Sequence, residues 1–553
     1  MFKSILIAAL IFTINVNAQV SVSVDSLFFP QMLTGSTDSI SVYIKNLSNQ
    51  QSEVKIINTK TVYGTSDTLI SISPNDSGIV WIKYHPNQNV IDKDLLFVSS
   101  DDSTVGLIIN INGSGKYGDS YDATTFNKYD NELKSTLTSL VINHISLGYS
   151  NLARDKMFME IDNQKVNGQG ATLNTIECVY IGRLAVGYID RVDAQNNYNF
   201  NTEHTWPQSN FSENEPMRSD LYHLYPTDNP ANGVRSNYPF GKVIANITWQ
   251  VGGSKLGRNS LNQIVFEPRD VHKGDVSRSM FYFITRYPVN YGGFFTQTQE
   301  NVFREWSKLD TVGVVESNRN NAIALLQLKR NPYIDHPEFV DRIYSFATNN
   351  IRPTFAELKV LPIKVEFDST NISEFTSQQV YIANSGSAQL NIDSITISDP
   401  RFSLSVNNNS IESFSSEKAL LQFHPDSIMN YNALLKVYTN GGVKEVVLTG
   451  IGKDNTVNVE DETFTPIVFA LEQNYPNPFN PSTLISYHLP VNNNVCLIVF
   501  DVLGNEVATL VNEFRTAGNH QINFNASNFS SGIYFYQLRS GNYLETKKML
   551  LLK

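Results

Sequence analysis

The sequence predicts a multidomain protein in which a mixed α+β segment is flanked by two β-sandwiches and followed by a small C-terminal β-sandwich. With 553 residues, the chain is longer than one hydrophobic core usually organises. Apolar and polar residues alternate, as in half-buried strands, over 19–116 and again over 353–453. Between these ranges, residues 117–352 instead carry apolar residues at helical spacing.

The composition indicates a globular protein that does not depend on disulfides. Hydrophobic residues make up 41% of the chain and charged residues 17%. The two cysteines, Cys178 and Cys496, are far apart in the sequence, which excludes a disulfide framework or a thiolate metal site, and no stable disulfide partner is implied. A net charge of -11 excludes a chain that is basic throughout, so affinity for nucleic acid would need a local basic patch and a metal ion.

Residues 1–18 have the pattern of a secretory signal peptide. Lys3 precedes an apolar run that closes on Val16-Asn17-Ala18, with small residues where a signal peptidase reads. The run is too short for a comfortable membrane span. No later stretch is long and apolar enough to cross a bilayer, so we expect the mature protein outside the cytoplasm.

The two predicted sandwiches share matching segments in the same order. The sequence Tyr84-His85-Pro86 is echoed by Phe423-His424-Pro425, residues 95–98 by 434–437, and residues 113–116 by 450–453. Three colinear matches indicate an internal duplication. Both ranges resemble the immunoglobulin-like modules found beside bacterial surface enzymes.

The central segment is predicted to contain three amphipathic or buried helices. The first is indicated by apolar residues at helical spacing: Leu133, Leu137, Leu140, Val141 and Ile145. The other two are expected over about 277–286 and 300–308. Near the end of the segment, Tyr333, His336 and Phe339 are expected to close the fold.

A polar, acidic stretch at 454–462 is predicted to be a linker, and 463–553 to be a separate β-domain. Its prolines near 476–481 exclude regular helix or sheet there, and its end, 547–553, is basic and apolar. This range resembles the C-terminal type A sorting domain of the type IX (Por) secretion system. The resemblance implies an outer-membrane secretion machinery as partner, with export through the periplasm of a Gram-negative bacterium to the medium or the cell surface.

Residues 201–209 and 220–237 carry the most informative polar side chains. A neutral imidazole such as His204 can take a proton from water, and the adjacent Glu203 can bind a hard divalent cation. Neighbouring residues of a strand point to opposite faces, so the pair needs an irregular backbone to act together. A zinc peptidase is the alternative, but the spacing is wrong for its two-histidine helix, and Pro207 is unfavourable in a helix.

The context of this pair resembles the endonuclease I family of secreted ββα-metal nucleases. The matching elements are colinear and lie at 203–209, 217–224, 232–238, 266–268, 273–278 and 331–337. The resemblance implies that 117–352 is an α+β nuclease domain of the ββα-metal type. It also implies a largely sequence-nonspecific endonuclease that cuts DNA, with RNA as a further substrate. The remaining alternative is a non-catalytic surface adhesin.

The resemblance also implies roles for individual residues. His204 would be the general base, Glu203 and Asn232 would hold one divalent cation, and Asp220 and His223 would orient them. The cation would be Mg²⁺, with Ca²⁺ or Mn²⁺ as alternatives. The transition-state arginine lies, in periplasmic relatives, in a cysteine-bearing segment that is short and cysteine-free here, so Arg218 is assigned to it only by position. The candidates for gripping phosphates are Arg235, Arg269, Lys273 and Arg278.

Several of these residues have a structural interpretation as well. Asp220 and His223 fit a hydrogen-bonded structural turn equally well, and each phosphate candidate fits a solvated or structural role. Trp206 and Tyr238 could stack on bases, but we expect both in the core. Acidic and basic residues are balanced over 203–342, without the basic excess typical of tight nucleic-acid binding.

Overall fold

The computed structural model describes residues 20–100, 105–454 and 468–553, which fall into two compact units divided after Asp454. The predicted signal peptide (1–18) and all of the predicted linker except Asp454 lie outside the described residues. None of the helices in the described part of the chain combines the length and the apolar character that a membrane crossing requires.

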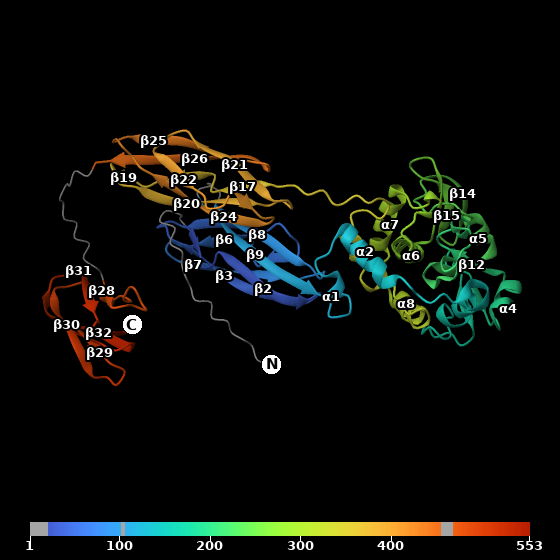
Figure 1. Cartoon of the computed structure of the whole chain (residues 1–553), viewed down its shortest axis with the longest axis horizontal. Coiled ribbons are helices and arrows are strands. Elements are labelled where there is room, and N and C mark those ends of the chain that lie inside the picture. The colour runs from blue at the N-terminus through green and yellow to red at the C-terminus, as the bar shows by residue number, and fades with distance from the viewer. Residues whose placement is uncertain (1–19, 101–104, 455–467) are drawn as a thin grey trace. The chain divides into compact units, whose positions relative to one another are not determined.

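The N-terminal range forms two facing sheets with one core between them (Figure 1). Their orders are β1-β3-β7-β5 and β2-β9-β8-β4-β6. The strands are β1 (Val20–Val22), β2 (Ser26–Leu33), β3 (Asp38–Asn46), β4 (Ser52–Ile57), β5 (Tyr63–Thr65), β6 (Leu69–Ile72), β7 (Ser77–Tyr84), β8 (Ile91–Ser100) and β9 (Gly106–Lys116). The alternation at 40–44 and 80–84 lies in β3 and β7, which pair antiparallel with Val42 opposite Val80. Both side chains are buried, as the period of two requires.

The second range of strands repeats this arrangement. The sheet orders are β17-β20-β24-β22 and β18-β26-β25-β21-β23, and β19 pairs with β26. The strands are β17 (Leu358–Leu361), β18 (Lys364–Glu366), β19 (Thr370–Asn371), β20 (Thr376–Asn384), β21 (Leu390–Ile397), β22 (Phe402–Ser405), β23 (Ser410–Ile411), β24 (Ser415–Phe423), β25 (Asn430–Thr439) and β26 (Gly442–Lys453). Tyr381 and Ala383 of β20 extend the core of the first pair of sheets, so the two sandwiches pack together.

The matching sequences of the two sandwiches occupy equivalent places. A Cβ on Gly113 would lie 2.7 Å from the ring of Tyr84, and one on Gly450 would lie 2.6 Å from the ring of Phe423. In both copies, therefore, an aromatic residue at the end of one strand packs on a glycine that leaves no room for a side chain. This shared contact supports the duplication that the sequence indicates.

The central segment packs its helices and short strands around a single aromatic-rich core. Its helices are α1 (Asp122–Thr125), α2 (Asp130–Val141), α3 (Arg154–Lys156), α4 (Arg191–Asn196), α5 (Asn229–Arg235), α6 (Lys273–Arg286), α7 (Gln297–Leu309), α8 (Val314–Gln327), α9 (Pro332–Asp335) and α10 (Phe339–Arg342). Its strands are β10 (Thr175–Glu177), β11 (Leu184–Val186), β12 (Phe200–His204), β13 (Leu224–Asp228), β14 (Ala245–Val251), β15 (Ser254–Arg258) and β16 (Ile264–Glu267). The three expected helices are α2, α6 and α7, although α2 ends before Ile145 and α6 begins four residues earlier than predicted.

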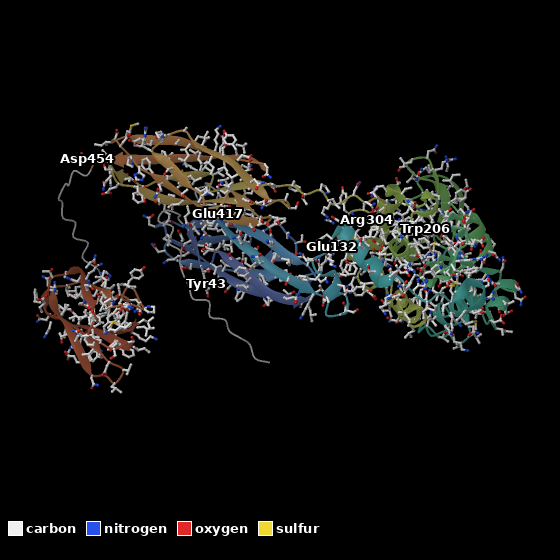
Figure 2. The ribbon with its side chains drawn as sticks, viewed as in Figure 1. Tyr43, Glu132, Trp206, Arg304, Glu417 and Asp454 are labelled. Atoms are coloured by element: carbon white, nitrogen blue, oxygen red, sulfur yellow. The ribbon has the colours of Figure 1, made fainter. Side chains whose placement is uncertain are left out.

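Trp206 confirms the expectation of a core role, whereas Tyr238 does not. Trp206 lies within the central segment (labelled in Figure 2), and its indole is fully buried. The indole stacks on Phe283 with ring centroids 4.6 Å apart. Tyr238 is 36% exposed, so the prediction that it is buried is wrong. It follows α5, where the chain returns to the surface.

The pair β12–β13 and helix α5 form one continuous supersecondary unit. The strands are antiparallel, with Glu203 opposite Tyr225 and His204 opposite Leu224. Helix α5 follows β13 directly because Asp228 caps it, accepting a hydrogen bond from the backbone nitrogen of Ala231 at 2.9 Å. Asn232 is thereby placed in the first turns of the helix beside the end of β12.

The C-terminal unit contains two further sheets, ordered β27-β28-β31 and β30-β29-β32-β33. The strands are β27 (Ala470–Leu471), β28 (Ser482–Leu489), β29 (Asn493–Phe500), β30 (Glu506–Arg515), β31 (Gly518–Asn525), β32 (Gly532–Ser540) and β33 (Tyr543–Leu551). The proline-rich segment before β28 is irregular, as predicted. The basic, apolar end of the chain is mostly strand β33, whose Met549 and Leu551 are buried.

His336 closes the central segment as a charged group. Its Nε2 lies 2.8 Å from Asp119 and its Nδ1 3.2 Å from Glu338, and its ring stacks on Tyr117. Burial lowers the pKa of His336, but the bonds to the two carboxylates outweigh it, so that the pKa is raised above its usual value.

We expect the stabilisation from His336 to be fully present below pH 6.5, the ordinary histidine pKa, and to disappear as pH rises through the raised pKa. Chemical unfolding of wild type and His336→Gln, followed from pH 5.5 to 9, should show the largest difference at the acidic end. The exposed His424→Gln is the control, with no such trend. A difference in unfolding free energy between wild type and His336→Gln that grows with pH would contradict the raised pKa of His336.

Candidate active site

Residues from β12 and α5 line one cavity of about 180 Å³. Its lining consists of Thr202, Glu203, His204, Pro207, Gln208, Asn232, Arg235, Ser236 and Asn237. The carboxylate, imidazole and amide singled out in the sequence therefore converge on one space. Glu203 and His204 can both face it because β12 ends at His204 and the chain turns away from the sheet through Pro207.

His204 is held as a neutral base. Its Nε2 lies 3.1 Å from the backbone carbonyl oxygen of Arg218, and because a carbonyl can only accept, Nε2 carries the proton. Burial, and then the neighbouring His223, lower the pKa of His204 well below its ordinary value. The ring is therefore neutral at pH 7, and Nδ1 holds the free lone pair.

Glu203 is a buried carboxylate held by one ion pair and one hydrogen bond. It is 2% exposed, and Arg235 Nε lies 3.1 Å from its Oε1. The hydroxyl of Tyr180 donates to the same oxygen at 2.7 Å. Burial raises the pKa of Glu203, while Arg235 and the Tyr180 hydrogen bond oppose that rise. Both contacts use Oε1, so neither occupies Oε2.

The donor set of the cavity fits a hard divalent cation. Glu203 supplies a carboxylate, and Asn232 and Gln208 supply amide groups. The Oε1 atom of Gln208 is buried and has no hydrogen-bond partner in the structure, so it is an acceptor without a donor. Oxygen ligands of these kinds are those that Mg²⁺ and Ca²⁺ prefer. No cluster of three or more His, Cys, Asp or Glu side chains suited to a metal occurs in the described ranges.

Comparison with known proteins places this geometry in a family. Residues 129–338 match the family model for Endonuclease I. The extracellular ribonuclease of Bacillus amyloliquefaciens is 30% identical over 234 residues, covering 38% of this chain and 73% of that protein. The chain belongs to the endonuclease I family.

Other relatives and a second family model extend this endonuclease I assignment. The extracellular ribonuclease of Bacillus subtilis (strain 168) is 29% identical over 245 residues, 41% of this chain and 78% of that protein. Endonuclease-1 of Buchnera aphidicola subsp. Baizongia pistaciae is 30% identical over 121 residues, 22% of this chain and 47% of that protein. Residues 473–552 match the secretion system C-terminal sorting domain. The protein is therefore an endonuclease I family nuclease with a secretion sorting domain, directed outside the cell or to its surface.

The contacts of Arg235 are with the protein itself, and the phosphate role predicted for it stays a prediction. Its side chain is 1% exposed, and its terminal nitrogens donate to the carbonyl oxygens of Thr205 at 2.6 Å and Ser236 at 2.8 Å. Its Nε forms an ion pair with Glu203 but no hydrogen bond. Arg235 instead fixes the carboxylate and the turn after β12.

The other three phosphate candidates of the endonuclease I segment lie away from the 180 Å³ cavity. Arg278 is 1% exposed and binds both oxygens of Glu316, at 2.7 and 2.5 Å. Lys273 Nζ lies between Glu267 at 2.7 Å and Asp270 at 2.8 Å. Helix α6 is buried on nearly all sides, so its cations need carboxylate partners. Arg278 and Lys273 thus have carboxylate partners away from the cavity, and their phosphate roles stay predictions.

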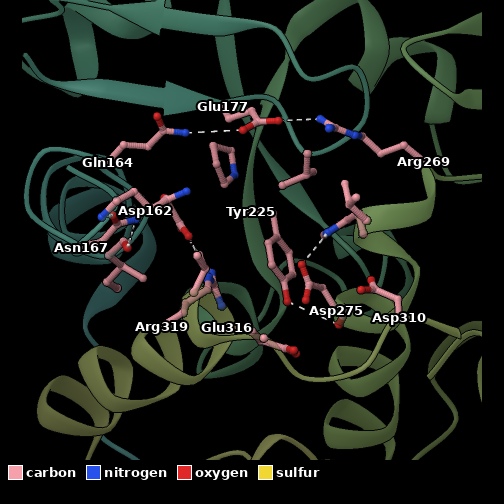
Figure 3. A pocket seen from close by; sticks show the side chains of 18 of the residues that line it. Asp162, Gln164, Asn167, Glu177, Tyr225, Arg269, Asp275, Asp310, Glu316 and Arg319 are labelled. Atoms are coloured by element: carbon pink, nitrogen blue, oxygen red, sulfur yellow. Dashed lines mark hydrogen bonds and ion pairs between the residues drawn. The ribbon is translucent and has the colours of Figure 1, made fainter. Parts of the chain in front are cut away.

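Arg269 lies at a second cavity of about 340 Å³, where it pairs with Glu177 at 2.6 Å (Figure 3). Carboxylates are numerous around this space, among them Asp162, Asp275 and Glu316. A surface rich in carboxylates repels phosphate. The surroundings of Arg269 therefore do not favour the phosphate role, which stays a prediction.

Asp220 and His223 organise the loop that holds the His204 ring. Asp220 is fully buried and accepts from the hydroxyls of Tyr282 at 3.0 Å and Tyr287 at 2.9 Å. His223 Nε2 donates to Met217 O at 2.6 Å, and its ring lies edge-on to that of His204 with centroids 5.3 Å apart. The structural turn considered from the sequence is present, and it positions the Arg218 carbonyl.

Arg218 contributes its backbone, while its side chain points elsewhere. The guanidinium pairs with Glu213 at 2.8 Å and lies 4.7 Å from the ring centre of Tyr149. It does not line the 180 Å³ cavity. The side chain is 30% exposed, so a transition-state role for Arg218 stays a prediction.

Sequence reasoning missed Tyr180 and the Arg218 carbonyl. Tyr180 lies 23 positions before Glu203, and no spacing rule connects the two. Gln208, in contrast, stands within the same short stretch as the Glu-His pair, and an amide so close to two catalytic groups is a signal that could have been used.

Proposed function

We propose that this protein is a metal-dependent, largely sequence-nonspecific endonuclease that hydrolyses phosphodiester bonds of DNA and RNA. The observation that carries the proposal is the shared cavity of Glu203, His204 and Asn232. RNA is included because two relatives are named extracellular ribonucleases. No helix in the described residues of this site is placed to read bases in a groove, and backbone contact carries no sequence information.

In this mechanism, Glu203 and Asn232 hold one divalent cation, with Mg²⁺ preferred and Ca²⁺ or Mn²⁺ as alternatives. The bound cation supplies positive charge for the phosphorane oxygens and the departing oxygen. His204 Nδ1 takes the proton of the attacking water, because Nε2 is already committed to the Arg218 carbonyl. Arg235 and Tyr180 keep the Glu203 carboxylate in place.

The fold and export assignments belong to the same proposal. The β12–β13–α5 unit, with Glu203 and His204 on a strand and Asn232 on the helix, supports a ββα-metal nuclease. The paired sheets of 19–116 and 353–453 support immunoglobulin-like modules around a nuclease domain at 117–352. The sorting domain, predicted at 463–553, would be read by an outer-membrane exporter after passage through the periplasm.

Removal of divalent cations tests the proposal. We expect the purified full-length chain to degrade plasmid DNA in the presence of Mg²⁺, to stop in excess EDTA and to recover when Mg²⁺ is restored. Parallel digestion of double-stranded DNA, single-stranded DNA and RNA ranks the substrates. Full activity in EDTA would refute the metal site, and failure to cut any of the three would refute the endonuclease.

A further inference from the structure

A third cavity, of about 510 Å³, lies in the central segment and has no part in the mechanism above. Its walls come from the loop after α5, strand β16, the turn before α7 and the first residues of α7. Phe240, Val265, Phe294 and Val302 supply apolar surface. Lys242 is the one charged residue in the described lining, and no carboxylate lines it, in contrast to the cavity that contains Arg269. Such a space suits a flat, uncharged group.

This cavity shares a wall with the candidate active site. Arg235, which lines the 180 Å³ cavity, has its guanidinium 4.6 Å from the ring centre of Phe240 and 6.0 Å from that of Phe294. Both rings also line the 510 Å³ cavity. Arg235 of the candidate active site therefore contacts two rings of the 510 Å³ cavity.

Gln299 places an unused hydrogen-bond donor in the lining. The residue is 5% exposed and lies in the first turn of α7. Its Oε1 accepts from the backbone nitrogen of Thr296 at 3.3 Å, as part of a capping box. Because a backbone nitrogen can only donate, the amide is fixed with its oxygen on the cap. The Nε2 atom is left buried without a partner in the structure.

We propose that the 510 Å³ cavity is a nucleobase subsite, which receives one unstacked base of the substrate strand next to the cut. This inference rests on the proposed endonuclease function. The apolar rings contact the base faces, and Gln299 Nε2 donates to a ring nitrogen or carbonyl oxygen of the base edge. All four bases carry such an acceptor, so the contact stabilises any base in the cavity and does not discriminate among the four. The subsite is therefore compatible with low sequence specificity.

Oligonucleotides that each carry one abasic nucleotide test the subsite. We expect the wild type to cut the abasic strand about tenfold more slowly than the normal strand at the one phosphodiester whose cleavage places the abasic position in the cavity. The reduction reflects the loss of stacking and of one hydrogen bond. Cutting at other positions should be unchanged. A flat profile would overturn the subsite and leave the nuclease intact, whereas no cutting of any oligonucleotide would instead refute the proposed function.

Gln299→Glu is the matched variant, because it keeps the Oε1 acceptor of the capping box and replaces the donor. We expect it to reduce cutting of normal strands at the sensitive position about tenfold, so that the difference between normal and abasic strands largely disappears. Gln297→Glu is the control. It adds the same charge two residues before Gln299, and Gln297 does not line the cavity. A base dependence that survives in Gln299→Glu would overturn the role of Gln299.

A filled cavity gives a second, independent readout. Thr298→Trp places a large ring at the opening while leaving Gln299 in place. Like Gln299→Glu, the variant should cut normal and abasic strands at similar rates at the sensitive substrate position. Retention of the full wild-type profile in Thr298→Trp would overturn the proposal.

Discussion

Replacing His204 with alanine is expected to lower kcat by roughly 10²- to 10⁴-fold, the usual contribution of a general base. The variant loses the imidazole that lines the cavity and whose Nε2 is held by the Arg218 carbonyl. Steady-state cleavage of a plasmid and of a short oligonucleotide, at saturating Mg²⁺, measures the loss.

Two controls separate loss of the base from loss of the fold. Thermal unfolding of His204→Ala should stay cooperative, and His424→Ala, an exposed histidine in the second sandwich, should keep full activity. Added imidazole should restore part of the activity of His204→Ala, because the variant leaves space at the cavity for a small base. A folded His204→Ala with wild-type kcat would exclude this residue as the base.

Replacing Arg235 with methionine is expected to lower the free energy of unfolding by about 3–5 kcal/mol, the cost of leaving a buried charge without its partner. The side chain is 1% exposed, and its removal leaves Glu203 without its ion-pair partner and the carbonyl oxygens of Thr205 and Ser236 without their donors. Activity should fall as well, because the carboxylate is no longer fixed. Denaturant unfolding measures the stability, and cleavage of an oligonucleotide measures the activity.

A double-mutant cycle shows whether the loss comes from the ion pair. Adding Glu203→Gln to Arg235→Met removes the unpaired charge, so it should recover part of the stability and none of the activity. Arg218→Met is the matched control, because its pair with Glu213 is exposed and should contribute only about 0–1 kcal/mol. Equal stability of Arg235→Met and wild type would contradict the buried pair.

The spacing of apolar residues predicted the helices and strands that have one buried face and one exposed face. Leu133 and Leu137 are buried on one side of α2, and Val42 and Val80 face each other across β3 and β7, so each pattern had a physical cause that a single sequence displays. The start of helix α6 was missed because Lys273 looks like a surface residue, although it is buried against Glu267. Arg278, within the predicted helix, is buried against Glu316, and a partner 38 residues away leaves no local pattern.

The residues of the candidate site also fall into those that the sequence identified and those that it did not. Glu203, His204 and Asn232 could be selected because their chemistry and context are readable from the sequence, and the structure brings them to one cavity. Arg235 could be noticed but not interpreted, since a guanidinium aimed at phosphate and one aimed at a buried carboxylate look identical in a sequence. The pairing with Glu203 depends on the packing of α5 against β12.

The acceptor that orients the His204 ring belongs to the main chain, and this has a consequence for genetics. No replacement of the Arg218 side chain can delete that oxygen. Random mutagenesis should therefore find position 218 tolerant with respect to ring orientation. Inactivating changes should instead accumulate at the residues that fix the path of the loop, such as Asp220, even though they never touch a substrate.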